Sequence, residues 1–187
     1  MNIKQLLAVC AASLTTAFAA QAAVVTVPST TTTTICDLCT VNSTINVGSH
    51  GTLSDVNVSI VDLRHTYDGD LAIWLISPTG TSVLLSNRRG GSGDNFINTV
   101  FDDSAVSLIG NAAAPFTGTF RAEGLLSAFN GQDAFGLWTL RVADMAAADV
   151  GVINSWNLQL TTVPEPGSLA LVGLALVGLG VARRRKA

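Results

Sequence analysis

The chain has 187 residues, 48% of them hydrophobic and only 12% charged, which leaves room for one domain of ordinary size. Residues 23–162 contain five arginines, no lysine, eleven aspartates and one glutamate, and this net charge of −7 argues against a nucleic-acid partner, because phosphate binding needs clustered positive charge. The length also argues against a complete protease, kinase or dinucleotide-binding enzyme, since those folds need more chain.

Residues 1–22 have the pattern of a secretory signal peptide. Lys4 supplies the positive start, residues 6–12 are apolar, and residues 20–22 read Ala-Gln-Ala, the small-residue pattern of a cleavage site. The apolar run is too short to span a membrane as a helix. We therefore expect the protein to be exported and this segment to be removed.

Residues 23–49 are rich in Val, Thr and Ser and contain five consecutive threonines at 30–34, so we expect an extended N-terminal arm or a first edge strand. Cys36 and Cys39 are the only cysteines of the exported chain. An oxidising compartment favours a disulfide between them, although so small a loop adds only about 2 kcal/mol. A redox motif would need a helix to follow, and a zinc site would need two more ligands.

Residues 50–162 have the pattern of a series of short β-strands. Apolar and polar residues alternate at 56–61, the period of a half-buried strand. Residues 71–77 are apolar on both faces, as in a central strand, and a Pro-Thr-Gly turn leads into 81–86. Further strands are expected at 97–102, 118–123, 137–144 and 152–161, and only 112–114, 125–129 and 145–148 hint at helix.

These patterns predict an all-β fold, a jelly-roll-like β-sandwich of about eight or nine strands. A signal peptide and a short C-terminal hydrophobic helix would flank it. The tryptophans of this region lie in apolar strands, where core packing is the usual role, although sandwiches can also use tryptophan to stack against sugars. Arg88 and Arg89, in a glycine-rich loop, are either a salt-bridged surface pair or contacts to an anionic sugar. The tryptophans are Trp74, Trp138 and Trp156.

Two separated motifs in this region are specific in sequence. The first is His-Thr-Tyr-Asp-Gly-Asp-Leu at 65–71, followed by Leu-Ile-Ser-Pro-Thr-Gly-Thr at 75–81. The second is Gly-Leu-Trp-Thr-Leu-Arg-Val-Ala-Asp at 136–144, followed by Gly151 and Asn-Ser-Trp-Asn-Leu at 154–158. Together they resemble the P domain, or P/Homo B domain, of furin- and kexin-type proprotein convertases. The resemblance implies a jelly-roll module, here residues 50–162, that packs against a protease and supports it without cutting peptide bonds.

Gly80-Thr81-Ser82 is similar to the sequence around the nucleophile of subtilisin-like proteases, with His65 and a nearby aspartate as imaginable partners. In those enzymes the serine opens a helix, whereas Ser82 leads into a predicted strand. No chain remains to build a substrate cleft or an oxyanion hole. We therefore predict no catalytic residue and no enzymatic activity.

Six aspartates are candidate calcium ligands, because converging carboxylates repel one another unless a cation neutralises them, and calcium accepts six to eight oxygens from irregular loops. The spacing is not that of an EF-hand. Two of the six are adjacent, so if both lie in a strand only one can join a shared site. In the alternative interpretation, the aspartates cap turns and keep the surface soluble. The candidates are Asp68, Asp70, Asp94, Asp102, Asp103 and Asp144.

The C-terminus, residues 163–187, contains Pro164-Glu165-Pro166, an apolar stretch at 168–182 and a basic cluster of Arg183, Arg184, Arg185 and Lys186. Fifteen apolar residues make a helix of about 22 Å, a marginal membrane span. This order resembles the PEP-CTERM sorting signal of Gram-negative bacteria that make exopolysaccharide. The resemblance implies an exosortase-type partner that cuts near Pro164–Pro166, with transient anchoring in the inner membrane; a plain tail anchor is the alternative.

We therefore expect an exported, non-catalytic interaction or structural module at the cell surface or in the exopolysaccharide matrix. One alternative is a detached accessory P domain that docks on a separate subtilisin-like protease. Another is a calcium-dependent carbohydrate-binding module. Apart from calcium, no cofactor is predicted.

Overall fold

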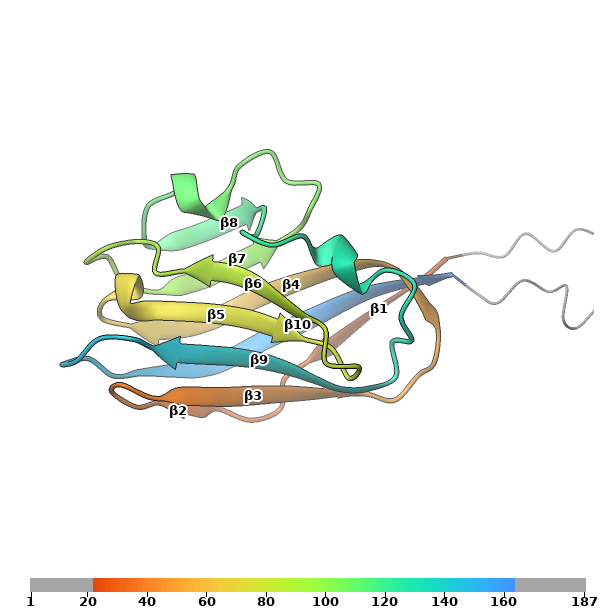
Figure 1. The fold of residues 1–187 in the computed structure, drawn as a ribbon, viewed down its shortest axis with the longest axis horizontal. Helices are drawn as coiled ribbons and strands as arrows, with labels where there is room; N and C mark the ends of the chain where they lie inside the picture. Colours follow the sequence, from red (N-terminus) through yellow and green to blue (C-terminus); the bar gives the residue numbers. More distant parts are fainter. Residues whose placement is uncertain (1–21, 164–187) are drawn as a thin grey trace, which may run out of the picture. The chain divides into compact units, whose positions relative to one another are not determined.

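A computed structural model describes residues 22–163 and shows ten strands in two stacked sheets (Figure 1). The predicted signal peptide, C-terminal helix and sorting residues lie outside the described residues, apart from Ala22 and Val163 at the boundaries. The strands are β1 (Ala23–Pro28), β2 (Thr33–Ile35), β3 (Thr40–Val47), β4 (Thr52–His65), β5 (Leu71–Ile76), β6 (Ser82–Asn87), β7 (Phe96–Phe101), β8 (Phe116–Phe120), β9 (Gly136–Asp144) and β10 (Gly151–Val163).

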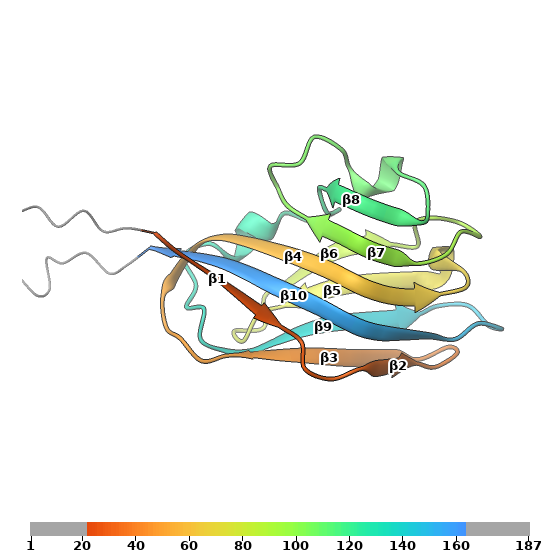
Figure 2. The same cartoon turned by 180° about the vertical axis from the view of Figure 1, so that it is seen from behind.

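The two sheets have different sizes and share no strand. The six-stranded sheet has the order β1-β10-β4-β7-β8, with β2 also paired to β10, and the four-stranded sheet has the order β3-β9-β5-β6. Every pair is antiparallel except β7 with β8. Figure 2 shows β1, β10 and β4 crossing the back of the molecule. The predicted all-β sandwich is confirmed.

The core lies between the sheets and follows the period-two alternation of the long strands. Along β9 the inward side chains of Trp138, Leu140 and Val142 are fully buried, while Arg141 between them is exposed. Trp156 on β10 is also fully buried. Both buried indole N–H groups donate hydrogen bonds, from Trp138 to the Ala134 carbonyl and from Trp156 to the Ser43 hydroxyl, each at 2.9 Å. The two buried tryptophans therefore pack in the apolar core with their indole N–H groups satisfied.

Residues 23–47 are more than an arm, because they add strands to both sheets. β1 pairs with β10 at the edge of the six-stranded sheet, and β3 pairs with β9 at the edge of the four-stranded sheet. A disulfide joins Cys36 to Cys39 in the turn between β2 and β3, where the chain passes from one sheet to the other. The pairing of β1 with residues 157–162 is too distant in sequence to be inferred from local pattern.

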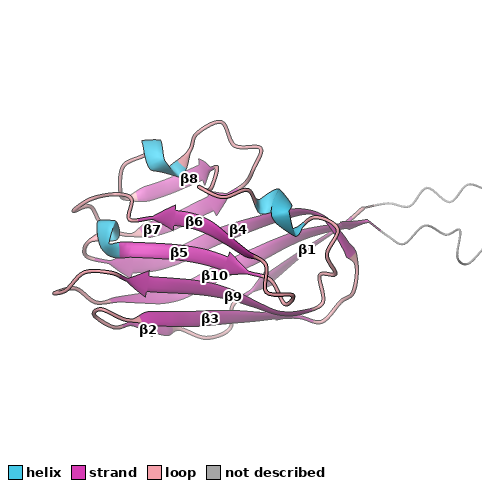
Figure 3. Ribbon diagram, in the orientation of Figure 1, coloured by secondary structure: helices cyan, strands magenta, loops and turns pink. Residues whose placement is uncertain are grey.

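Helical structure within the described residues is limited to three short 3₁₀ turns, η1 (Asp68–Asp70), η2 (Ile109–Asn111) and η3 (Leu126–Phe129), as Figure 3 shows. The hint of helix at 125–129 corresponds to η3, whereas 145–148 forms no helix. In the described part of the chain, no helix has the length and apolar character needed to cross a membrane.

Candidate functional site

A cluster of buried polar side chains lies at one end of the sandwich, where β4 ends, η1 turns and β9 ends. The cross-strand pairs Gly151 with His65 and Leu71 with Asp144 bring these ends together. The cluster consists of His65, Asp68, Asp70 and Asp144, all at most 6% exposed. Burying three carboxyl groups costs free energy unless each finds a partner, so their contacts decide what the cluster can do.

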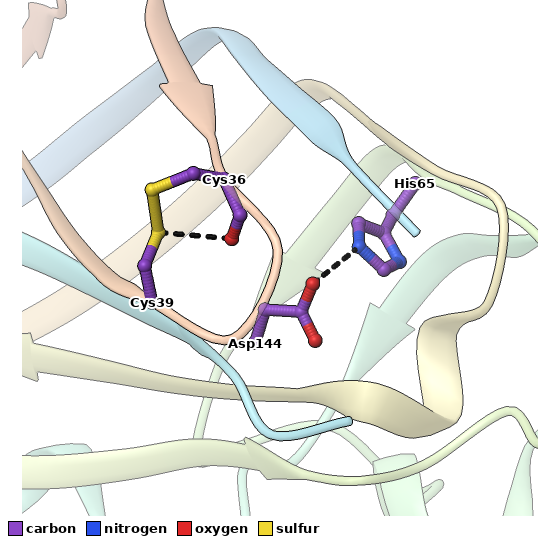
Figure 4. The surroundings of a disulfide bond; sticks show 4 residues. All are labelled: Cys36, Cys39, His65 and Asp144. Carbon is purple, nitrogen blue, oxygen red and sulfur yellow. Dashed lines mark hydrogen bonds and ion pairs between the residues drawn. A yellow bond between two sulfur atoms is a disulfide. The ribbon is translucent and has the colours of Figure 1, made fainter. Parts of the chain in front are cut away.

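Asp144 faces His65. Its Oδ2 lies 3.4 Å from His65 Nε2, and both side chains are fully buried (Figure 4). The other ring nitrogen, Nδ1, lies 3.0 Å from the Tyr67 carbonyl, and Asp144 Oδ1 accepts a hydrogen bond from the Ala146 N–H. Behind this pair, the Asp144 N–H donates to the carbonyl of Cys39 in the disulfide turn. The pair therefore ties the β9 loop to the end of β4.

Asp68 has one satisfied and one unsatisfied carboxyl oxygen. Oδ1 accepts the Asn95 N–H at 3.0 Å, while Oδ2 is buried without a hydrogen-bond partner among the described residues. Burial, together with the nearby charge of Asp94, raises the pKa of Asp68 to about 7. Gly90 lets the glycine-rich loop approach closely: its φ is +97°, and a Cβ there would lie 2.9 Å from the Asp68 Cβ.

Asp70 turns toward Arg88 rather than toward the other carboxylates. The Arg88 Nη2 lies 3.8 Å from Asp70 Oδ1, and the Arg88 Nε donates to the Gly69 carbonyl at 3.1 Å. Arg89 forms a closer pair with Glu123, at 2.7 Å. Both arginines of the predicted loop are therefore engaged in ion pairs within the domain.

Asp102 and Asp103 lie away from the buried cluster. They follow β7, whereas Asp94 and Asn95 precede it, and a strand of this length separates its two ends by about 20 Å. Asp103 accepts the backbone N–H groups of Leu126 and Ser127, and Asp102 accepts that of Ser104. Burial and the neighbouring charges of Asp102 and Asp103 raise the pKa of Asp55. At this end the aspartates cap turns.

The six predicted calcium ligands therefore divide into separate groups. Within the described residues, no three histidine, cysteine or acidic side chains are arranged to hold a metal ion. Asp144 faces His65 and Asp70 faces Arg88. Among the six candidates in the described chain, the buried carboxyl oxygens without a hydrogen-bond partner are Asp68 Oδ2 and Asp144 Oδ2, and Asp144 Oδ2 has His65 Nε2 at 3.4 Å. These side chains do not form a calcium cage by themselves. Calcium binding stays a prediction.

Ser82 and His65 are not neighbours. Ser82 pairs with Ile76 at one end of β5, while Leu71 at the other end pairs with Asp144, the contact of His65. Five residues of strand correspond to about 17 Å. Ser82 is also exposed on the outside of the sheet, whereas His65 is buried. The resemblance of residues 80–82 to a protease nucleophile is confined to the sequence.

A shallow groove lies on the outer face of the four-stranded sheet. It has a volume of about 400 Å³ and includes Trp74, Arg141, Asn42, Thr40 and Ser82 in its lining. Trp74 is partly exposed, unlike the other two tryptophans. Sequence analysis did not single out Arg141 or Asn42. Their outward positions in the alternation of β9 and β3 were the available signal.

The fold and the sequence motifs together define a β-sandwich module of a known class. Residues 53–160 match the family model of the proprotein convertase P-domain, and residues 162–186 match the PEP-CTERM protein-sorting motif. The chain belongs to the proprotein convertase P-domain family.

The relatives are much longer proteins. Leupeptin-inactivating enzyme 1 of Streptomyces exfoliatus is 38% identical over 111 residues, which are 59% of this chain and 19% of that protein. A calcium-dependent protease of Trichormus variabilis is 38% identical over 103 residues, 54% of this chain and 13% of that protein. A serine protease of Aeromonas sobria shares the fold with a TM-score of 0.52 at 21% identity, covering 85% of this chain and 30% of the protease chain.

Proposed function

We propose that this chain is an exported, non-catalytic P-domain module that acts by binding at the cell surface or in an extracellular polysaccharide matrix. The observation that carries the proposal is the separation of Ser82 from the buried His65–Asp144 pair along β5. General-base activation of a serine requires a hydrogen bond between the serine and its base. The sandwich offers sheet faces and loops for binding instead.

The sorting motif at 162–186 supports the location. We propose that the chain is exported by its N-terminal segment, held briefly in the inner membrane by its C-terminal segment, and cut near Pro164–Pro166 by an exosortase-type enzyme. β1 begins beside the end of β10, with Ala23 opposite Thr162. Both ends of the described chain therefore lie together, and Val163 pairs with Thr52 at the start of β4, whereas the buried cluster lies at the end of β4.

Fractionation of the producing cells, with mass spectrometry of the recovered protein, tests this proposal. We expect a chain that begins at Ala23 and has lost its basic tail, recovered with surface polysaccharide. In a strain without the sorting enzyme, the chain should keep its tail and remain in the membrane fraction. Recovery of the uncut chain from the cytoplasm of the normal strain would contradict the proposal.

A second candidate function is favoured by the comparisons. Two of the relatives are named as calcium-dependent proteases, and the matched region covers 13% and 16% of their length. A detached P domain could support a separate subtilisin-like protease by packing against it. Stoichiometric co-purification of one protease with the processed chain would favour this function, whereas recovery with polysaccharide and without a protease would favour the first.

A further inference from the structure

We propose that the outer face of the four-stranded sheet binds a carboxylate-bearing polysaccharide through Trp74 and Arg141. This inference names a ligand for the proposed binding module and so rests on the proposed function. It depends on a row of side chains that the sheet register aligns. Asn42 on β3, Arg141 on β9 and Trp74 on β5 are direct cross-strand neighbours, and all three line the groove.

The groove has a floor of small residues beside this row. The next row across β3 and β9 consists of Thr40 and Ala143, which also line the groove, and Ala143 is only 5% exposed. The larger side chains of Trp74 and Arg141 therefore stand above a low floor. The volume of the groove, about 400 Å³, falls within the range of small-ligand sites.

Trp74 differs from the buried tryptophans in its polar atom as well as in its exposure. The indole N–H groups of Trp138 and Trp156 each donate to a protein oxygen, whereas that of Trp74 has no acceptor among the described residues. A partly exposed indole offers an apolar ring and a free donor. A sugar ring has a matching apolar C–H face and hydroxyl groups at its edge.

Arg141 supplies the charge preference. Arg64, Arg88 and Arg89 each pair with a carboxylate, but Arg141 has no acidic partner within the described part of the chain. The hydrogen bond that its side chain makes there is from Nε to Asn42 Oδ1, at 3.4 Å. An exposed, uncompensated guanidinium on an otherwise acidic domain favours a carboxylate, which it can bind through two parallel hydrogen bonds.

The uncharged groups around this pair favour a glycan over an acidic peptide. Asn42, Thr40 and Ser82 bring an amide and two hydroxyl groups to the groove, which suit a ligand rich in hydroxyls. A peptide recognised by strand addition needs free backbone groups at a sheet edge. β5 and β9 are both internal strands, paired on each side, so this face can recognise a ligand only through side chains.

Binding of polygalacturonate to the purified full-length chain tests the inference. We expect Trp74→Ala and Arg141→Gln each to weaken binding roughly tenfold or more, because each removes a main contact. Arg121→Gln is the matched control, since Arg121 is exposed, has no acidic partner among the described residues, and follows β8 in the other sheet. It should leave binding unchanged. Equal melting temperatures would show that all three variants are folded.

Other results would overturn the inference. These are no binding of polygalacturonate, equal binding of neutral dextran, or equal losses in Arg121→Gln and Arg141→Gln. Tighter binding of poly-L-glutamate than of polygalacturonate would assign the face to an acidic protein. A further outcome is that the Trp74→Ala variant is exported and retained in the matrix as well as the unchanged chain is. In that case the ligand site lies elsewhere, while the proposed function stands. If the chain binds polygalacturonate but is never exported, the proposed function fails alone.

Discussion

The two faces of β9 carry side chains with different roles. Trp138 points inward, is fully buried and has its N–H bonded to Ala134, whereas Arg141, three residues along, points outward without a carboxylate partner among the described residues. The polar atom of Trp138 on the inner face has a partner within the domain, whereas the charge of Arg141 on the outer face has none among the described residues. Burial and partner satisfaction therefore separate residues that stabilise the sandwich from residues that are available to a ligand, and the following predictions test that division.

The largest effect is expected inside the sandwich. Trp138→Ala should lower the free energy of unfolding by about 3–5 kcal/mol, because it leaves a large cavity and an unpaired Ala134 carbonyl. Trp74→Ala, which removes a partly exposed ring, should cost much less. Denaturant unfolding of both variants measures the difference. Equal losses would show that Trp74 belongs to the core and would remove the contrast between the two faces.

A smaller effect concerns the buried carboxyl of Asp68. Its pKa in the folded state is about 7, above its ordinary value of 3.8, so the folded protein binds the proton more tightly than the unfolded chain does. In chelator, this group should make the protein about 2 kcal/mol less stable at about pH 8 than at about pH 5, and Asp68→Asn should remove that slope.

Asp133→Asn is a suitable control for this slope. The hydrogen bond from His50 lowers the pKa of Asp133 to about 2, so this carboxyl stays ionised throughout the same pH window. Unfolding free energies of the chain and the two variants, measured across that window, make the comparison. A slope that persists in Asp68→Asn would show that another group causes it.

Calcium binding at Asp68 should change the same pH dependence of stability. A cation bound at Asp68 Oδ2 would stabilise the ionised carboxylate, so excess calcium should raise the melting temperature at about pH 8 and flatten the pH dependence. The effect should disappear in Asp68→Asn. Equal melting temperatures in excess calcium and in chelator would remove the calcium prediction.

The disulfide turn should contribute less than the core. Replacing both Cys36 and Cys39 by serine should cost at most about 2 kcal/mol, because the bond closes a very small loop. Since Thr40 and Asn42 are held by pairing with β9, ligand binding in the groove should persist. Loss of the whole fold in this variant would show that the turn between the sheets is essential.

The sequence predicted the elements better than the contacts between them. The alternation at 56–61 and the apolar run at 71–77 correspond to β4 and β5, because side-chain period is a local property. β1 was missed as a definite strand because its partner lies more than a hundred residues away, at 157–162. Local pattern carries no information on such pairing.

The grouping of the aspartates shows the same limit. The sequence alone could have shown that Asp94 and Asp102 lie far apart, since a predicted strand runs between them. The contacts of Asp144 with His65 and of Asp70 with Arg88 could not be predicted, because they depend on which loops meet at the end of the sandwich. The groove residues could not be grouped from the sequence for a related reason, because they become neighbours only through the register of β3, β9 and β5.

The central claim is that this sandwich binds and does not cut. The most direct measurement is mass spectrometry of a peptide mixture incubated with the purified chain and with its Ser82→Ala variant. We expect no new cleavage product with either protein, because Ser82 lies about 17 Å along β5 from the buried His65–Asp144 pair. Cleavage by the unchanged chain that disappears in Ser82→Ala would contradict the account.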